Sequence, residues 1–129
     1  MKFSGTRLLL LFVIPWSFYS CKKEIDPTPQ LVLGRWEIKE AYRNGRPTES
    51  LDDLFFEFKA EEKMATNLPV TEVPMEARYE VKKGKIEQTQ GEITLVYQIE
   101  SLTDSSMALI TNFKGFDFRF VLGRSPLYN

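Results

Sequence analysis

Few residues in this chain could carry out chemistry, and the most versatile type is missing. The 129-residue sequence contains no histidine and a single cysteine, Cys21. Without histidine the chain lacks the usual general base near neutral pH and the usual metal ligand. One cysteine cannot form an internal disulfide, and neither a Ser–His nor a Cys–His pair can be assembled. Nucleophilic catalysis by a Ser–His or a Cys–His pair is therefore excluded.

Two pairs of adjacent carboxylates remain as candidates for acid–base or metal chemistry. They are Asp52 with Asp53, and Glu61 with Glu62. Both pairs fall at predicted turns, and the oxygen-ligand spacing of a calcium-binding loop is absent. Solvated loop charge is therefore preferred over a loosely bound cation at Asp52 and Asp53. No phosphate-binding glycine motif occurs either. We expect no catalytic residues, no metal site and no cofactor, and hence no enzyme.

The charge balance also limits the partners. Lysine and arginine total 17 against 18 aspartate and glutamate residues, for a formal net charge of −1. A nucleic-acid-binding protein would be expected to have a basic face, so nucleic acid is not an expected partner. Lys82, Lys83 and Lys85 form a basic cluster at a predicted hairpin tip. Solubility is the preferred interpretation of this cluster, with contact to an anionic surface as the alternative.

The N-terminal segment has the pattern of an export signal. Lys2 and Arg7 precede an apolar run from Leu8 to Ile14, which is too short to span a membrane as a helix. The segment ends in Ser20-Cys21, which resembles the bacterial lipobox. This resemblance implies cleavage before Cys21 and attachment of lipid to Cys21. The alternative is an ordinary secretory signal with an incidental cysteine.

A polar stretch follows Cys21 and contains Pro27 and Pro29. This composition is typical of a tether. The expected organisation is a signal peptide over residues 1–20, the lipidated Cys21 with a tether over 21–29, and one folded domain over 30–129. The lysine and glutamate residues after Cys21 resemble the export signals of some Gram-negative lipoproteins. The expected location is therefore the cell envelope, anchored in the outer membrane and facing the periplasm or the surface.

The folded domain is predicted to consist of short antiparallel strands. Pro29 and Gly34 bracket one helical turn, and period-2 alternation with tight turns follows. These features predict an all-β fold, an eight-stranded up-and-down barrel that leaves no exposed sheet edge. The predicted strands are Trp36–Tyr42, Leu54–Phe58, Lys63–Leu68, Ala77–Lys82, Lys85–Gln88, Glu92–Glu100, Met107–Asn112 and Phe116–Leu122.

Two stretches resemble lipocalins. Gly34-Arg35-Trp36 opens the first predicted strand like the lipocalin G-x-W motif, and residues 77–111 resemble the closing strands of lipocalin-like lipoproteins. The resemblance implies a lipocalin-like barrel in which Trp36 packs at the closed end against an arginine near the end of the last strand. Arg124 is the better match and Arg119 the second. These are structural residues and not a ligand site.

The inward faces of the strands are aromatic, which leaves two functions open. An eight-stranded barrel is either filled by side chains or holds one small ligand. The first function is binding of a small apolar or amphipathic molecule at the end of the barrel that carries the long loops, away from the tether. The second is an interaction or structural role, in which a filled barrel contacts an envelope protein or glycan. A monomer is expected. The candidate ligand-binding residues are Tyr42, Phe56, Met75, Tyr79, Ile93, Tyr97, Phe113 and Phe116.

Cys21→Ala tests the expected lipid anchor. Each buried methylene of an acyl chain contributes about 0.8 kcal/mol, so several chains hold a protein firmly in a bilayer. The variant is expected to leave the membrane fraction, or to accumulate unlipidated, when cells are fractionated with detergent. Equal partitioning of variant and parent into the detergent phase would show that Cys21 is not the anchor.

Overall fold

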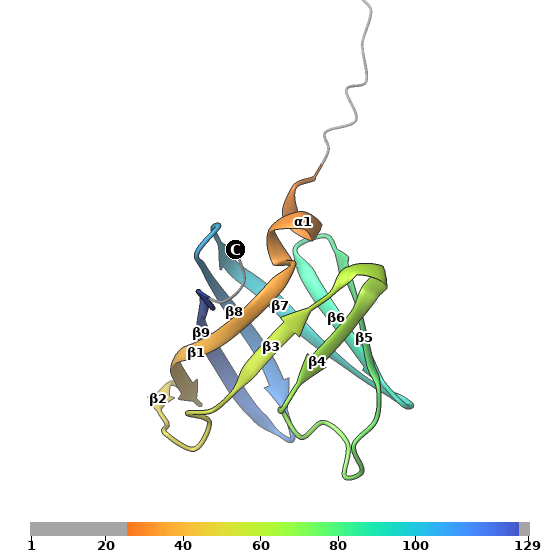
Figure 1. Cartoon of the computed structure of the whole chain (residues 1–129). Coiled ribbons are helices and arrows are strands. Elements are labelled where there is room, and N and C mark those ends of the chain that lie inside the picture. The colour runs from red at the N-terminus through yellow and green to blue at the C-terminus, as the bar shows by residue number, and fades with distance from the viewer. Residues whose placement is uncertain (1–25, 127–129) are drawn as a thin grey trace, which may run out of the picture.

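The computed structural model describes residues 26–126, which form one barrel with a short helix at one end (Figure 1). The predicted signal peptide and the lipidation of Cys21 lie outside the described residues. Among residues 26–126, none of the helices is long and apolar enough to span a membrane. The elements are the helix α1 (Thr28–Val32), the 3₁₀ turn η1 (Ala60–Glu62), and the strands β1 (Gly34–Arg43), β2 (Arg46–Pro47), β3 (Phe55–Phe58), β4 (Lys63–Thr66), β5 (Ala77–Lys82), β6 (Lys85–Gln90), β7 (Ile93–Leu102), β8 (Ser106–Phe113) and β9 (Phe116–Arg124).

The sheet closes on itself. From β3 to β9 each strand pairs antiparallel with the next, and β1 pairs with both β3 and β9. The two-residue β2 only extends the sheet beside the end of β1. The predicted eight-stranded antiparallel barrel with an N-terminal helical turn is therefore confirmed. Closure leaves no long unpaired edge that could template pairing with another chain.

The alternating strand directions divide the connections between two ends of the barrel. The end that carries α1 also carries η1 and the turns at 83–84 and 103–105. The opposite end, which we call the mouth, carries the loops 44–54 and 67–76 and the turns 91–92 and 114–115 (Figure 1). Two of these turns, Asn44-Gly45 and Lys114-Gly115, have positive φ at both residues, which is the geometry of tight hairpins.

A bulge in β1 changes which side chains face inward. The pairing of β1 with β9 shifts register between Ile38 and Glu40, so that Ala41 faces the core. Tyr42 lies opposite Arg119, on the outer surface of the barrel. Strict alternation from Trp36 along the predicted strand Trp36–Tyr42 would place Tyr42 on the inner face, so its selection as an inward-facing candidate is wrong. One extra residue reverses the alternation, and the sequence pattern does not reveal it.

The interior of the barrel is filled by large side chains. Phe56 contacts Tyr97 edge to face with ring centroids 5.4 Å apart, and Phe118 stacks on Phe120 at 5.6 Å. The central residues Phe56, Tyr97 and Phe120 are fully buried and line none of five hollows at the surface of the described residues. The largest fully buried side chains are Trp36, Tyr97, Phe56, Phe58, Phe120, Ile86, Met107, Leu109 and Leu122.

Arg124 closes the barrel at the α1 end. Its guanidinium carbon lies 4.2 Å from the ring centroid of Trp36, which is fully buried. Its nitrogens donate to the carbonyl oxygens of Leu31 (2.6 Å), Leu33 (2.5 Å) and Asp104 (2.6 Å). A Cβ at Gly34 would lie 2.5 Å from Nη1 of Arg124, so this position requires glycine. The indole Nε1 donates to the Val32 carbonyl at 2.9 Å, which fixes α1 over the ring.

Trp36→Ala tests this closure. Removal of a large buried side chain is expected to lower the free energy of unfolding by about 3–5 kcal/mol, because a cavity opens beneath α1. Denaturant unfolding of the variant measures this loss. Tyr42→Ala, on the outer surface of the same strand, is the control and is expected to change stability little. Equal unfolding midpoints for Trp36→Ala and the parent would show that Trp36 does not close the barrel.

Candidate functional site

The eight candidate ligand-binding residues fall into three groups in the structure. Phe113, Phe116, Ile93 and Met75 lie at the mouth, where strands and loops meet solvent. Phe56 and Tyr97 are fully buried in the core. Tyr42 and Tyr79 lie elsewhere, so the candidates do not form a single site.

The structure places neither Tyr79 nor Tyr42 in the lining of the mouth, so the prediction that they line it is wrong. Tyr79 sits towards the α1 end, where its hydroxyl donates to the Lys59 carbonyl at 2.9 Å. It lines a hollow of about 480 Å³ between α1, η1 and β5, on the opposite side from the mouth. Tyr42 lies on the outer surface, where its hydroxyl donates to the Glu40 carboxylate. A strand crosses the whole barrel, so sharing a face does not place two residues at the same end.

Tyr97 and Phe56 form the floor beneath the mouth. The Tyr97 hydroxyl donates to Oε1 of Gln88 at 2.5 Å, and burial raises the pKa of Tyr97 above its usual range. The phenol therefore stays protonated and remains a donor at physiological pH. Phe56 packs against the same ring and both side chains are fully buried, so a ligand at this depth would have to displace them.

A ladder of amides connects this floor to the loop 67–76. Nε2 of Gln88 donates to Oε1 of Gln90 at 3.0 Å, and Nε2 of Gln90 donates to the Thr71 hydroxyl at 3.0 Å. Leu68 and Val70 of the same loop are buried, so the loop plugs part of the mouth. This plug was not among the features predicted from the sequence. The available signal was the apolar Leu68 and Val70 within a loop rich in proline.

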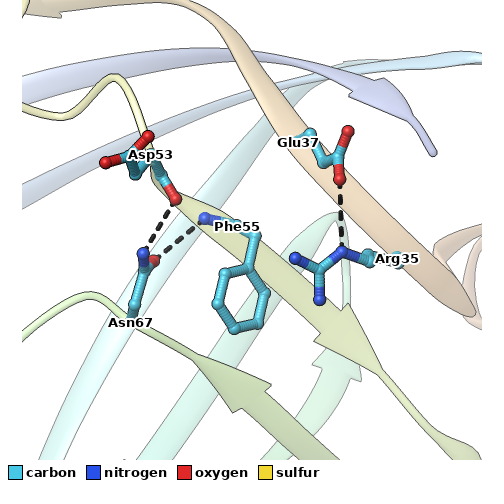
Figure 2. A network of polar contacts seen from close by, with 5 residues as sticks. All are labelled: Arg35, Glu37, Asp53, Phe55 and Asn67. Carbon is cyan, nitrogen blue, oxygen red and sulfur yellow. Dashed lines mark hydrogen bonds and ion pairs between the residues drawn. The ribbon is translucent and has the colours of Figure 1, made fainter.

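Hydrogen bonds of the Asn67 side chain also hold the loops of the mouth together, as Figure 2 shows. Nδ2 of Asn67 donates to the Asp53 carbonyl at 2.8 Å, and Oδ1 of Asn67 accepts from the Phe55 amide at 3.0 Å. Beside Asn67, Nε of Arg35 lies 3.3 Å from Oε2 of Glu37. The guanidinium carbon of Arg35 lies 4.0 Å from the centroid of the Phe55 ring. Asn67 thus pairs like an additional strand residue and joins the loops 44–54 and 67–76.

An apolar arc remains exposed around the plug. Phe116 is 42% exposed, Ile93 46% and Met75 50%. Phe116 begins β9 and Ile93 begins β7, on either side of β8, whose last residue Phe113 pairs with Phe116. Met75 packs on Gly91, in the turn that leads to Ile93, since a Cβ at Gly91 would lie 3.0 Å from its sulfur. The apolar arc therefore consists of side chains at the mouth ends of β7, β8 and β9 together with Met75.

Basic side chains cover one end of the apolar arc. The guanidinium carbon of Arg43 lies 5.3 Å from the centroid of the Phe116 ring, and Nζ of Lys114 lies 5.1 Å from that of Phe113. A polar hollow of about 550 Å³ lies beside Phe116. A surface with apolar rings on one side and cations on the other suits an amphipathic molecule. The hollow is lined by Arg43, Asn44, Arg46, Pro47, Thr48 and Phe116.

The described residues offer no alternative centre for chemistry. Among residues 26–126, no group of three or more cysteine, aspartate or glutamate side chains is placed to hold a metal ion. Every buried side-chain nitrogen or oxygen within this range has a hydrogen-bond partner. The mouth, which gathers four of the eight candidate residues beside a polar hollow, is taken as the candidate site.

Thr71→Val tests whether the amide ladder fastens the plug. The change removes the acceptor for Gln90 while keeping the side-chain shape, and it leaves a buried amide donor unpaired, which costs about 1–3 kcal/mol. Hydrogen exchange at the Val70 amide, which donates to the Leu68 carbonyl, is expected to accelerate. Thr89→Val, on the exposed face of β6, is the control. Unchanged exchange at Val70 in the Thr71 variant would show that the ladder does not hold the loop.

Comparison with known proteins supports the fold. No protein-family model matches the chain, and no curated protein is similar to it in sequence. Among solved structures, the chain is similar to a lipocalin-like protein from Bacteroides uniformis with a TM-score of 0.56 and 14% sequence identity. The match covers 74% of this chain and 99% of that one. At this identity the likeness concerns the fold alone, and it supports a lipocalin-like barrel.

Proposed function

We propose that the protein is a lipid-anchored protein of the cell envelope that binds a small amphipathic molecule at the mouth of its barrel. The observation that carries the proposal is the arrangement at Phe116. Its ring is 42% exposed, continues into the apolar arc, and carries Arg43 over its face. Exposed aromatic rings beside cations favour a ligand that has both an apolar and a polar part.

The proposed binding is shallow. Phe56, Tyr97 and Phe120 fill the centre of the barrel, and Leu68 and Val70 occupy part of the mouth. A ligand enclosed deep in the barrel would have to displace these side chains from a close-packed core. A ligand lying along the apolar arc displaces only solvent.

The position of the mouth agrees with the proposed anchor. Cys21 precedes the first described residue, Asp26, by five positions, and α1 follows directly at one end of the barrel. The mouth lies at the other end (Figure 1). With lipid on Cys21, the α1 end would face the membrane and the mouth would face away from it. Loops on a rigid scaffold are a common place for binding residues.

One observation favours a second candidate function. Because the barrel is filled, the same exposed arc and loops could instead contact an envelope protein or glycan, with the barrel serving as a rigid support. The two functions differ in whether a small molecule binds to the purified protein in the absence of other envelope components. A small amphiphile that saturates the mouth of the purified protein supports the first, whereas binding only to envelope extracts supports the second.

Phe116→Ala tests the proposed site, with octyl glucoside below its micelle-forming concentration as the probe. Loss of the exposed ring is expected to weaken binding about tenfold, which corresponds to about 1.4 kcal/mol of lost apolar contact. Isothermal titration of the full chain carrying Cys21→Ala measures the affinity. Lys83→Glu, at the α1 end, is the control and is expected to bind like the parent. Loss of binding in the Lys83 variant with normal binding in the Phe116 variant would contradict the proposal.

A further inference from the structure

Two arginines at the mouth face each other without an acidic partner. Arg43 and Arg46 flank the Asn44-Gly45 turn and are directly opposite in the pairing of β1 with β2. Like charges directly opposite each other on neighbouring strands destabilise a sheet. The four ion pairs found among the described residues involve Arg35, Lys63, Lys82 and Arg119, and neither Arg43 nor Arg46 takes part in one.

Three carboxylates on the same or adjoining segments have other partners or line other hollows. The Asp117 carboxylate accepts from Nδ2 of Asn112 at 2.9 Å, and the Glu40 carboxylate accepts from the Tyr42 hydroxyl. Glu49 lines two neighbouring hollows and not the hollow that contains Arg43 and Arg46. Lys114, in the adjacent turn, adds a third positive charge. None of Arg43, Arg46 and Lys114, the basic group at the mouth, therefore forms an ion pair within the described part of the chain.

The two turns that carry these cations are joined to each other. The Asn44 amide donates to the Asp117 carbonyl at 2.7 Å, and the Asp117 amide donates to Oδ1 of Asn44 at 2.9 Å. The Phe116 ring lies beneath the Arg43 guanidinium and limits its orientations. Backbone placement of the basic group is thus fixed before any ligand arrives, which lowers the entropy lost on binding.

We infer that the hollow lined by Arg43 and Arg46 is an anion subsite, and that the amphipathic ligand carries a carboxylate, phosphate or sulfate group. The inference rests on the proposed function and specifies the ligand class. Guanidinium groups bind such anions through paired, charge-assisted hydrogen bonds. The anion lies between Arg43 and Arg46 with Lys114 nearby, and the ligand's apolar part runs from Phe116 along the apolar arc. Binding relieves the repulsion between the two arginines.

Titration of the full chain carrying Cys21→Ala with octyl phosphate, octyl glucoside and inorganic phosphate tests the subsite. Octyl phosphate is expected to bind at least about tenfold more tightly than octyl glucoside. The double variant Arg43→Gln/Arg46→Gln is expected to lose this preference, so that it binds octyl phosphate no more tightly than it binds octyl glucoside. Lys83→Gln removes one charge at the α1 end and is the matched control. Inorganic phosphate is expected to bind weakly and to compete with octyl phosphate.

The possible results separate the two proposals. If the double arginine variant keeps the preference for octyl phosphate, the anion subsite is wrong although the apolar site stands. If Phe116→Ala binds both amphiphiles like the parent, the proposed function is wrong. Flotation with vesicles of phosphatidylglycerol, compared with phosphatidylcholine, identifies the source of the anion. Arginine-dependent flotation assigns the subsite to lipid headgroups, and octyl phosphate binding without flotation assigns it to a free amphiphile.

Discussion

The guanidinium of Arg124 joins the three parts of the chain that must meet for the barrel to close. It stacks on Trp36 of β1, bonds the carbonyls of Leu31 and Leu33 around α1, and reaches Asp104 in the turn between β7 and β8. A lysine could supply the charge but not the planar fork that these contacts require. Because Arg124 ends β9 and pairs with Trp36 near the start of β1, this cluster fixes the register in which the last strand returns to the first.

Closure at the α1 end determines what the other end can do. The aromatic side chains above Trp36 are fully buried against one another, so a ligand in the centre of the barrel would have to displace them. At the mouth, Asn67 joins two loops and the Gln88–Gln90–Thr71 ladder holds the plug. These bonds preserve a fixed rim on which Phe116 and Arg43 stay exposed. The filled interior is the reason that the proposed binding lies at the rim of the barrel.

Sequence periodicity was sufficient for the barrel but not for the site. Alternation, hairpin turns and the position of Trp36 predicted all eight strands, because these signals are local. Tyr42 was misplaced because the β1 bulge depends on pairing with β9, which local periodicity does not contain. Tyr79 faces inward as predicted, but it lies towards the α1 end of the barrel axis, and alternation along a strand does not give the position along this axis. The role of Arg43 and Arg46 emerges only when β2 pairs with β1.

The central claim is that an amphipathic ligand lies on the rim of a filled barrel. Nuclear magnetic resonance of the full chain carrying Cys21→Ala, titrated with octyl phosphate, tests it most directly. The account predicts shifts at the amides of residues 43–46 and 113–116 and at the side chains of Ile93 and Met75, with Met107, Leu109 and Leu122 unchanged. Shifts of these three buried side chains, with nuclear Overhauser contacts to the octyl chain, would show that the ligand enters the interior and would contradict the account.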